Sequence, residues 1–184
     1  MSLIMNIREK IIKQILSKAK YNDIGTYLIA PRVGKTRILI EIIKKFKYKK
    51  ILWVTPNTKL RDEDIPNEFI KWKAKTYLSK TNIVCYSSLK KQSGEYDLIV
   101  LDEVQCLSLL QANRLLSKRL TFKSLIGLTG TLPKHKIKLD IMSYLGLDEI
   151  LKEISINEAI DNNIVADYKV MTIGIPIDSI NKNI

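Results

Sequence analysis

Short apolar segments alternate with amphipathic ones along most of this chain, and this alternation constrains its fold more than any other feature. Apolar runs of strand length lie at residues 27–30, 51–55, 82–86, 97–101 and 125–129. Segments of helical periodicity lie between them, at residues 5–20, 35–47, 108–120 and 136–145. A charged helical segment that breaks at Pro66 runs to about Lys73, and Ser155 to Glu158 form a capping box that begins a helix. Strands that alternate with helices predict a parallel sheet covered on both faces.

Length and composition fit one globular domain and little more. The 184 residues are 46% hydrophobic and 27% charged, which is typical of a folded domain rather than of a disordered or fibrous chain. No stretch approaches about 18 uncharged apolar residues, so a membrane span is not expected. We expect one domain over residues 1–166, and an exit strand or linker over residues 167–184.

The cysteine content suggests a reducing compartment. Cys85 and Cys106 both lie in apolar runs, and His135 is the single histidine. This inventory supports neither a disulfide framework nor a zinc site, so we expect both thiols to be buried and reduced. The chain begins with residues that lead directly into charged ones, without the pattern of a secretory signal. We therefore expect a cytoplasmic protein.

The charge is distributed unevenly along the chain. Residues 1–92 hold 21 Lys and Arg against 7 Asp and Glu, whereas residues 93–184 hold 10 against 12. A surface this basic attracts polyanions, and nucleic acid is the commonest polyanion inside cells. Most of the basic residues are lysines, however, which the codon usage of an AT-rich genome would also produce. Charge alone leaves both interpretations open.

Gly34, Lys35 and Thr36 stand between a predicted strand and a predicted helix. A nucleoside triphosphate needs inward-facing backbone N–H groups, a cation at the β- and γ-phosphates, and a hydroxyl on Mg²⁺. Lys35 and Thr36 supply the last two. The complete pattern G-x-x-x-x-G-K-S/T would place glycine where this chain has Ile29, so the sequence predicts a degenerate phosphate loop.

Asp102 and Glu103 follow the apolar run at residues 97–101. The carboxyl end of a strand is where an open α/β sheet places its ligand-binding groups. A triphosphate bound with magnesium needs one carboxylate near the metal and a second group that orients the attacking water. The competing interpretation is an acidic pair that caps the next helix.

Five segments resemble the motifs of superfamily 2 helicases, and they occur in the family's order across residues 28–133. Residues 30–36 (APRVGKT) resemble motif I, and residues 102–105 (DEVQ) resemble motif II, the DEAD/DEAH box. Residues 129–131 (TGT) resemble motif III in the form of the Swi2/Snf2-like and phage-type members. Motif Ia and its helix resemble residues 54–60 (VTPNTKL) and 69–72 (FIKW), and motif Ib resembles residues 84–89 (VCYSSL). The resemblance implies an N-terminal RecA-like motor domain, a three-layer P-loop NTPase with a mostly parallel central sheet.

The resemblance also implies roles at the nucleotide. Lys35 would bind the phosphates of ATP, and the rest of the loop would be formed by Arg32, Val33, Gly34 and Arg37. Mg²⁺ would be held by Thr36 and Asp102, while Glu103 would orient or activate the attacking water. Gln14, 21 residues before Lys35, would either contact adenine or be an ordinary solvated helix residue.

Two further groups of residues follow from the same resemblance. Gln105 would couple the nucleotide site to motif III, which comprises Thr129, Gly130 and Thr131. The residues beside a nucleic-acid backbone would be Asn57, Lys59, Arg61, Ser87 and Ser88.

These roles predict the motor domain of an ATP-dependent nucleic-acid helicase or translocase. The Thr-Gly-Thr form of motif III favours DNA over RNA as the partner. The family couples two RecA-like domains, so we expect a second such domain in the full-length chain and weak or no ATP hydrolysis without it. The alternative is a module that binds nucleotide and nucleic acid without turnover.

Overall fold

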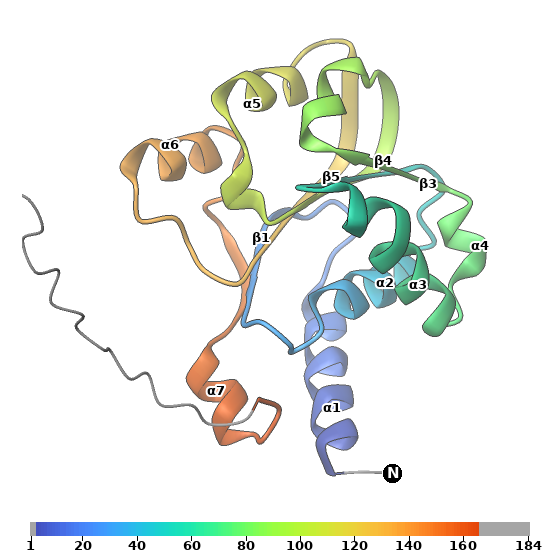
Figure 1. The fold of residues 1–184 in the computed structure, drawn as a ribbon, viewed down its shortest axis with the longest axis vertical. Helices are drawn as coiled ribbons and strands as arrows, with labels where there is room; N and C mark the ends of the chain where they lie inside the picture. Colours follow the sequence, from blue (N-terminus) through green and yellow to red (C-terminus); the bar gives the residue numbers. More distant parts are fainter. Residues whose placement is uncertain (1–2, 166–184) are drawn as a thin grey trace, which may run out of the picture.

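The computed structural model describes residues 3–165, which form a six-stranded sheet between two layers of helices (Figure 1). The strands are β1 (Ile24–Ile29), β2 (Ile51–Thr55), β3 (Thr81–Cys85), β4 (Gly94–Asp102), β5 (Leu120–Thr129) and β6 (Ile150–Ile154). Their order across the sheet is β3-β2-β4-β5-β1-β6, and the five pairs of neighbouring strands are all parallel. The predicted α/β fold with a parallel sheet is confirmed. The linker predicted over residues 167–184 lies outside the described residues.

The helices divide between the two faces of the sheet, because side chains of one strand alternate between two apolar cores. Trp53 on β2 faces one core, which also contains residues of α1 (Leu3–Lys18), α2 (Lys35–Phe46), α3 (Ile65–Lys71) and α7 (Ile156–Asp161). Leu52 faces the other core, together with α5 (Leu109–Leu115) and α6 (Lys136–Tyr144). A sheet covered on both faces explains why its central strands read as continuous apolar runs.

The predicted helical break at Pro66 is a change of helix type instead. Residues Leu60–Asp64 form a π-helical turn, and α3 follows without interruption, with Pro66 in its first turn. Because the helix is continuous, Pro66 removes one hydrogen bond from its interior, and this irregularity directly follows the wider π-helical turn. The short helix α4 (Lys75–Leu78) comes next and was not predicted.

Other differences lie at the ends of elements. β4 begins at Gly94 and β5 at Leu120, both earlier than predicted, and α5 ends at Leu115 because the chain has already turned into β5. β6 was missed altogether. Its sequence, ILKEI, is short and carries two charges, which an edge strand tolerates since one side of it has no neighbour.

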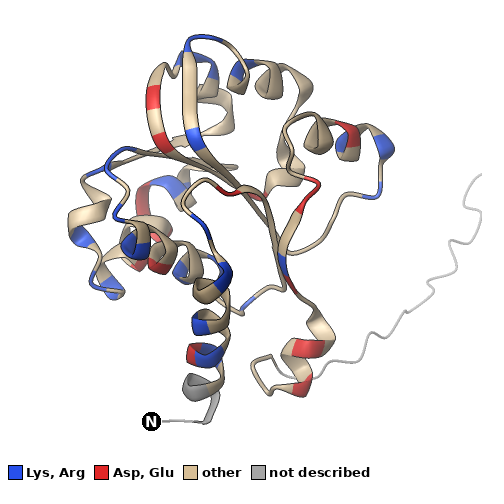
Figure 2. Cartoon of the chain, turned by 180° about the vertical axis from the view of Figure 1, so that it is seen from behind, with Lys and Arg blue, Asp and Glu red and all other residues tan. Residues whose placement is uncertain are grey.

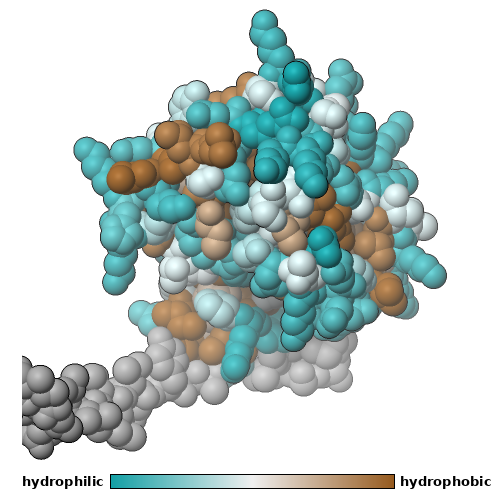
Figure 3. All heavy atoms as spheres, turned by 45° about the horizontal axis from the view of Figure 1, so that its top comes forward, coloured by the Kyte–Doolittle hydropathy of each residue, from teal (hydrophilic) through white to brown (hydrophobic). Residues whose placement is uncertain are grey.

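The surface of the helical layers carries both charged and apolar side chains. Lys and Arg recur along α1 and on the neighbouring helices of the same face (Figure 2). Apolar surface is visible among the hydrophilic residues in Figure 3, and the two most exposed large apolar side chains of the described residues, Leu110 and Ile137, belong to α5 and α6. Within residues 3–165, no helix combines the length and the hydropathy that a membrane crossing requires.

We expect the packing between α3 and the sheet to contribute strongly to stability. Phe69 is completely buried, and its ring meets that of Trp53 edge to face at 5.8 Å between centroids. Phe69→Ala should lower the free energy of unfolding by about 3–5 kcal/mol through the lost burial and the resulting cavity. Ile70→Ala is the matched control, because its side chain is 55% exposed on the same helix. Urea denaturation followed by circular dichroism measures both; equal effects of the two substitutions would contradict the packing.

Candidate nucleotide and nucleic-acid site

The carboxyl ends of β1, β4 and β5 bring the predicted nucleotide residues to one edge of the sheet. β5 lies between β4 and β1, although it comes last of the three in the chain. After β1 the chain crosses the sheet to form β2 and leaves room for two strands between them. It later returns to form β4 and β5 in that space. Ligands of open α/β sheets bind at such a switch in strand order.

The loop between β1 and α2 has the backbone of an anion-binding turn. Arg32 and Gly34 both have positive φ angles, of 67° and 113°, and the latter lies where glycine is favoured. Gly34 is the N-cap of α2, and no side chain caps the helix. The first turn of α2 carries no acidic residue either, so its N–H groups and the positive end of its dipole remain free to bind an anion. Ile29, at the position of the missing glycine, is the buried last residue of β1.

A continuous chain of polar contacts connects this loop to motif III. The Lys35 ammonium donates to Glu103 Oε1 at 2.6 Å, and Gln105 Nε2 donates to Glu103 Oε2 at 2.8 Å. Thr129 Oγ1 lies 2.7 Å from Gln105 Oε1 and also 2.7 Å from the carbonyl oxygen of Thr131. The hydroxyl has one proton, so it donates to one of these two acceptors at a time. The backbone N–H of Thr131 donates back to the hydroxyl at 3.2 Å.

The two acidic residues have opposite electrostatic environments. Burial, and then the charge of Glu103, raise the pKa of Asp102 from its usual 3.8 to about 6, against the opposing charge of Lys35. Partial burial alone would raise the pKa of Glu103 too, but hydrogen bonds from Lys35 and Gln105 outweigh it and hold that pKa below its usual value. Glu103 also has a positive φ of 50°, a strained conformation for a non-glycine residue that is typical of functional sites. Glu103 is thus ionised and oriented at neutral pH.

The residues fit a magnesium ion that is shared with a phosphate. Mg²⁺ prefers oxygen ligands and is usually held by one or two carboxylates together with substrate phosphates and water. Asp102 supplies a buried carboxylate whose negative charge is poorly compensated, and Thr36 supplies a hydroxyl in the first turn of α2. The described residues contain no cluster of three or more His, Cys, Asp or Glu that would form a complete protein cage for a metal. The donor set therefore suits Mg²⁺ bound with a nucleotide.

A hollow of about 500 Å³ opens beside the phosphate loop. Its lining includes all the loop residues that the sequence predicted, and several that it did not: Arg8, Glu68, Lys71 and Trp72. Arg8 Nη2 donates to the carbonyl oxygen of Arg32 at 3.1 Å, which ties α1 to the loop. No sequence periodicity marks these four residues as ligand-binding, because α1 and α3 meet the loop only through the tertiary fold.

Gln14 is not brought to this hollow. Its side chain is exposed on α1 and lines a separate depression formed along that helix with Glu9, Lys10, Lys13 and Ser17. Cys106, which we predicted to be buried, is exposed because it follows β4 in the short 3₁₀ turn at Val104–Cys106. Cys85 is buried as expected.

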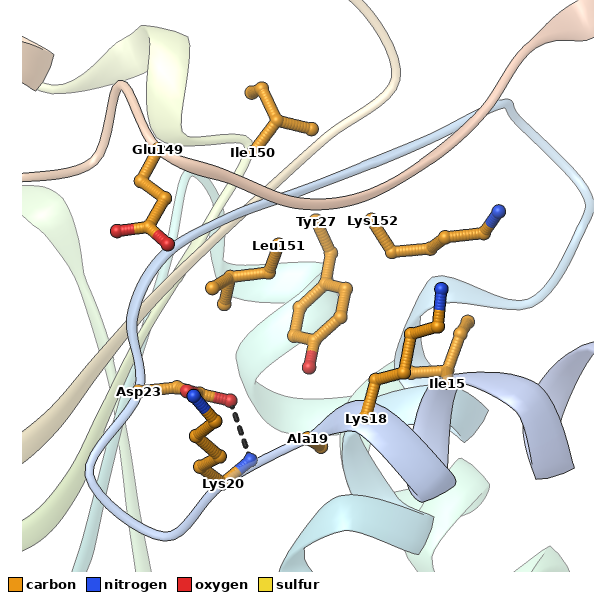
Figure 4. A pocket seen from close by; sticks show the side chains of 10 residues that line it. All are labelled: Ile15, Lys18, Ala19, Lys20, Asp23, Tyr27, Glu149, Ile150, Leu151 and Lys152. Atoms are coloured by element: carbon orange, nitrogen blue, oxygen red, sulfur yellow. Dashed lines mark hydrogen bonds between the residues drawn. The ribbon is translucent and has the colours of Figure 1, made fainter.

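Another hollow, of about 170 Å³, lies away from all of the predicted site residues. It is formed where the end of α1 meets β1 and β6, and its walls carry the lysines Lys18, Lys20 and Lys152 with Tyr27 between them (Figure 4). The hollow contains no phosphate-loop or acidic-motif residue. It therefore has no part in the nucleotide site.

The predicted nucleic-acid residues follow two adjacent strands. Asn57, Lys59 and Arg61 come after β2, while Ser87 and Ser88 come after β3, and the ends of these strands pair at Thr55 and Cys85. Asn57, Lys59 and Ser87 are exposed. Asn57 accepts a hydrogen bond from the Leu60 N–H at 2.9 Å, and Arg61 forms an ion pair with Asp62 at 2.7 Å. The structure thus gathers both groups at one edge, beside a carboxylate that reduces the free positive charge of Arg61.

Comparison with solved structures identifies the fold. No protein-family model matches the sequence, and a search of curated proteins finds no match. The crystal structure of the Hef helicase domain of Pyrococcus furiosus is similar over 82% of this chain, with a TM-score of 0.57 and 18% sequence identity. The described residues therefore share the fold of that helicase domain. The chain spans 37% of the length of that structure.

The pKa of Asp102 gives a stability prediction. Burial favours the protonated form of Asp102, because its pKa rises from 3.8 to about 6 on folding. The stability that comes from this protonation is lost as the pH rises through 6, and above that pH the ionised carboxylate opposes folding. Asp102→Asn should therefore stabilise the fold at pH 8 by up to about 3 kcal/mol, and this gain should shrink toward pH 5. Asp140→Asn, which removes an exposed carboxylate on α6, is the matched control. Thermal and urea denaturation across this range measure the difference; a variant less stable than wild type at pH 8 would refute the assignment.

Proposed function

We propose that this chain is the ATP-binding motor domain of an ATP-dependent nucleic-acid helicase or translocase. The observation that carries the proposal is the contact chain from Lys35 through Glu103 and Gln105 to Thr129. It joins a candidate phosphate-binding ammonium to a candidate water-orienting carboxylate, and both to the end of a third strand. The RecA-like fold supports the proposal by placing these groups where such sheets bind their ligands.

The chemistry follows from the position of each side chain. Lys35 and the free N–H groups of α2 would bind the β- and γ-phosphates of ATP, while Thr36 and Asp102 would hold Mg²⁺, which would neutralise phosphate charge. A phosphate that takes Lys35 from Glu103 would remove the main group that lowers the pKa of this carboxylate. Glu103 would then become a better acceptor for a proton of the attacking water, and Gln105 would keep it oriented.

Substitution of the two partners of the ion pair should separate binding from turnover. Lys35→Ala should weaken Mg-ATP binding about tenfold or more, because it removes a charge-assisted contact to phosphate. Glu103→Gln should bind ATP nearly as wild type but lose at least about 100-fold in any hydrolysis that nucleic acid stimulates. Lys44→Ala is the matched control, since Lys44 lies on the same helix and pairs with Glu41 at the surface.

Fluorescent-nucleotide titration and phosphate release measure these effects. Equal ATP affinity of wild type and Lys35→Ala would overturn the nucleotide assignment. Binding that depends on Lys35 without any turnover, even with nucleic acid and the second RecA-like domain supplied, would favour a binding module over a motor.

We further propose that nucleic acid, with DNA preferred, binds at the ends of β2 and β3. Its phosphates would contact the exposed Lys59 and the neighbouring polar residues, without reading base sequence. The edge also carries the phosphate loop, so the polymer and ATP would bind on the same side of the sheet. A second RecA-like domain would close this edge and supply the remaining contacts.

Salt dependence should locate this interface. Ala substitution of both Lys59 and Arg61 should reduce the slope of log K against log salt by about one to two, and weaken all sequences alike. Ala substitution of Lys49 and Lys50 is the matched control, since these lysines precede β2 and lie at its opposite end. Fluorescence anisotropy with single-stranded and duplex oligonucleotides measures both. A larger change in the control would show a diffuse positive field instead of a localised site.

A further inference from the structure

The wall of the loop-side hollow contains a flat cation–aromatic pair, Arg37 and Trp72, and the nucleotide chemistry above gives Trp72 no role. The guanidinium carbon of Arg37 lies 3.8 Å from the centre of the Trp72 ring. Arg37 is in the first turn of α2, and Trp72 follows the end of α3. Both side chains line the same hollow as the phosphate loop. Planar groups of this kind are the surfaces on which nucleobases stack.

Both members of the pair are held in place by other contacts. Arg37 forms an ion pair with Glu9 of α1, and its side chain is only 13% exposed. The indole Nε1 of Trp72 donates to Glu68 Oε2 at 2.6 Å, while the other carboxylate oxygen of Glu68 accepts from Lys71 at 2.8 Å. A wall that is ordered by its own contacts loses little conformational entropy when a ligand binds to it.

The position of the hollow defines what part of a ligand would reach this wall. If the triphosphate of a nucleotide binds to Lys35 and the start of α2, the sugar and base of that nucleotide must lie in the space beside the phosphate loop. The hollow that the loop itself lines is about 500 Å³, within the range of small-molecule sites. Gln14, for which the resemblance left open an adenine contact or an ordinary solvated position, lines a different depression.

We propose that the Arg37–Trp72 pair is the base-binding wall of the nucleotide site, on which the base of a nucleoside triphosphate stacks. This inference rests on the proposed nucleotide binding and adds to it. The wall makes the site favour a nucleoside triphosphate over inorganic triphosphate, because the latter has no base to stack.

The tryptophan fluorescence of the protein can report ligand binding at Trp72, because the chain has two tryptophans and Trp53 is fully buried. Mg-ATP should quench the fluorescence of the wild type and of Trp53→Phe, in which Trp72 is the remaining indole, whereas magnesium triphosphate should not. Trp72→Phe keeps an aromatic ring and should bind ATP within about threefold of wild type without the quench. Trp72→Ala should bind ATP about 5- to 100-fold more weakly, but triphosphate unchanged.

The outcomes separate this inference from the function on which it rests. Lys35-dependent ATP binding that is the same in wild type and Trp72→Ala would overturn the base-binding wall and leave the nucleotide site standing. Quenching by a single-stranded oligonucleotide but not by ATP would assign Trp72 to nucleic acid, and would also overturn it. Failure of the wild type to bind ATP would remove both proposals. Denaturation curves verify that each variant is folded.

Discussion

An ion pair across the sheet holds the candidate site together. Lys35 follows β1 and Glu103 follows β4, yet these strands are not neighbours, because β5 lies between them. The 2.6 Å contact spans the end of the intervening strand, and both side chains are partly shielded from solvent. Shielding strengthens the attraction between opposite charges, and it makes an unpaired charge costly. A phosphate that binds Lys35 must therefore also change the environment of Glu103.

β5, the strand between β1 and β4, connects the environment of Glu103 to the protein surface. Thr129 ends β5, and its hydroxyl lies between Gln105 and the backbone of Thr131. Thr131 and Gly130 line an apolar hollow of about 460 Å³ together with Pro31 from the phosphate loop. A movement of Glu103 would therefore displace Gln105 and, through Gln105, alter a surface that the phosphate loop also lines. In the proposed motor, this surface is where nucleotide state would be communicated to a partner domain.

The packing of α1, α2 and α3 against one face of the sheet shapes the other side of the loop. Phe69 and Trp53 fix α3 on the sheet, while Arg8 and Glu9 connect α1 to the loop and to Arg37. These contacts bring Trp72 into the wall of the nucleotide hollow. The Lys and Arg residues on these helices add a long-range attraction for polyanions. At the nucleic-acid edge, Asp62 pairs with Arg61 and reduces the positive charge that Arg61 contributes.

The amino-acid pattern was enough to predict the layered α/β fold, the central strands and the positions of the loop and acidic motifs, because these depend on local periodicity and on short spacings. It did not reveal β6, whose edge position relaxes the demand for apolar residues, or the exposure of Cys106. Only the packing of the helices on the sheet shows that Gln14 lies apart from the loop and that Trp72 stacks on Arg37. Those contacts join residues from separate helices, and their distances depend on how the helices cross the sheet, which no pattern within one helix specifies.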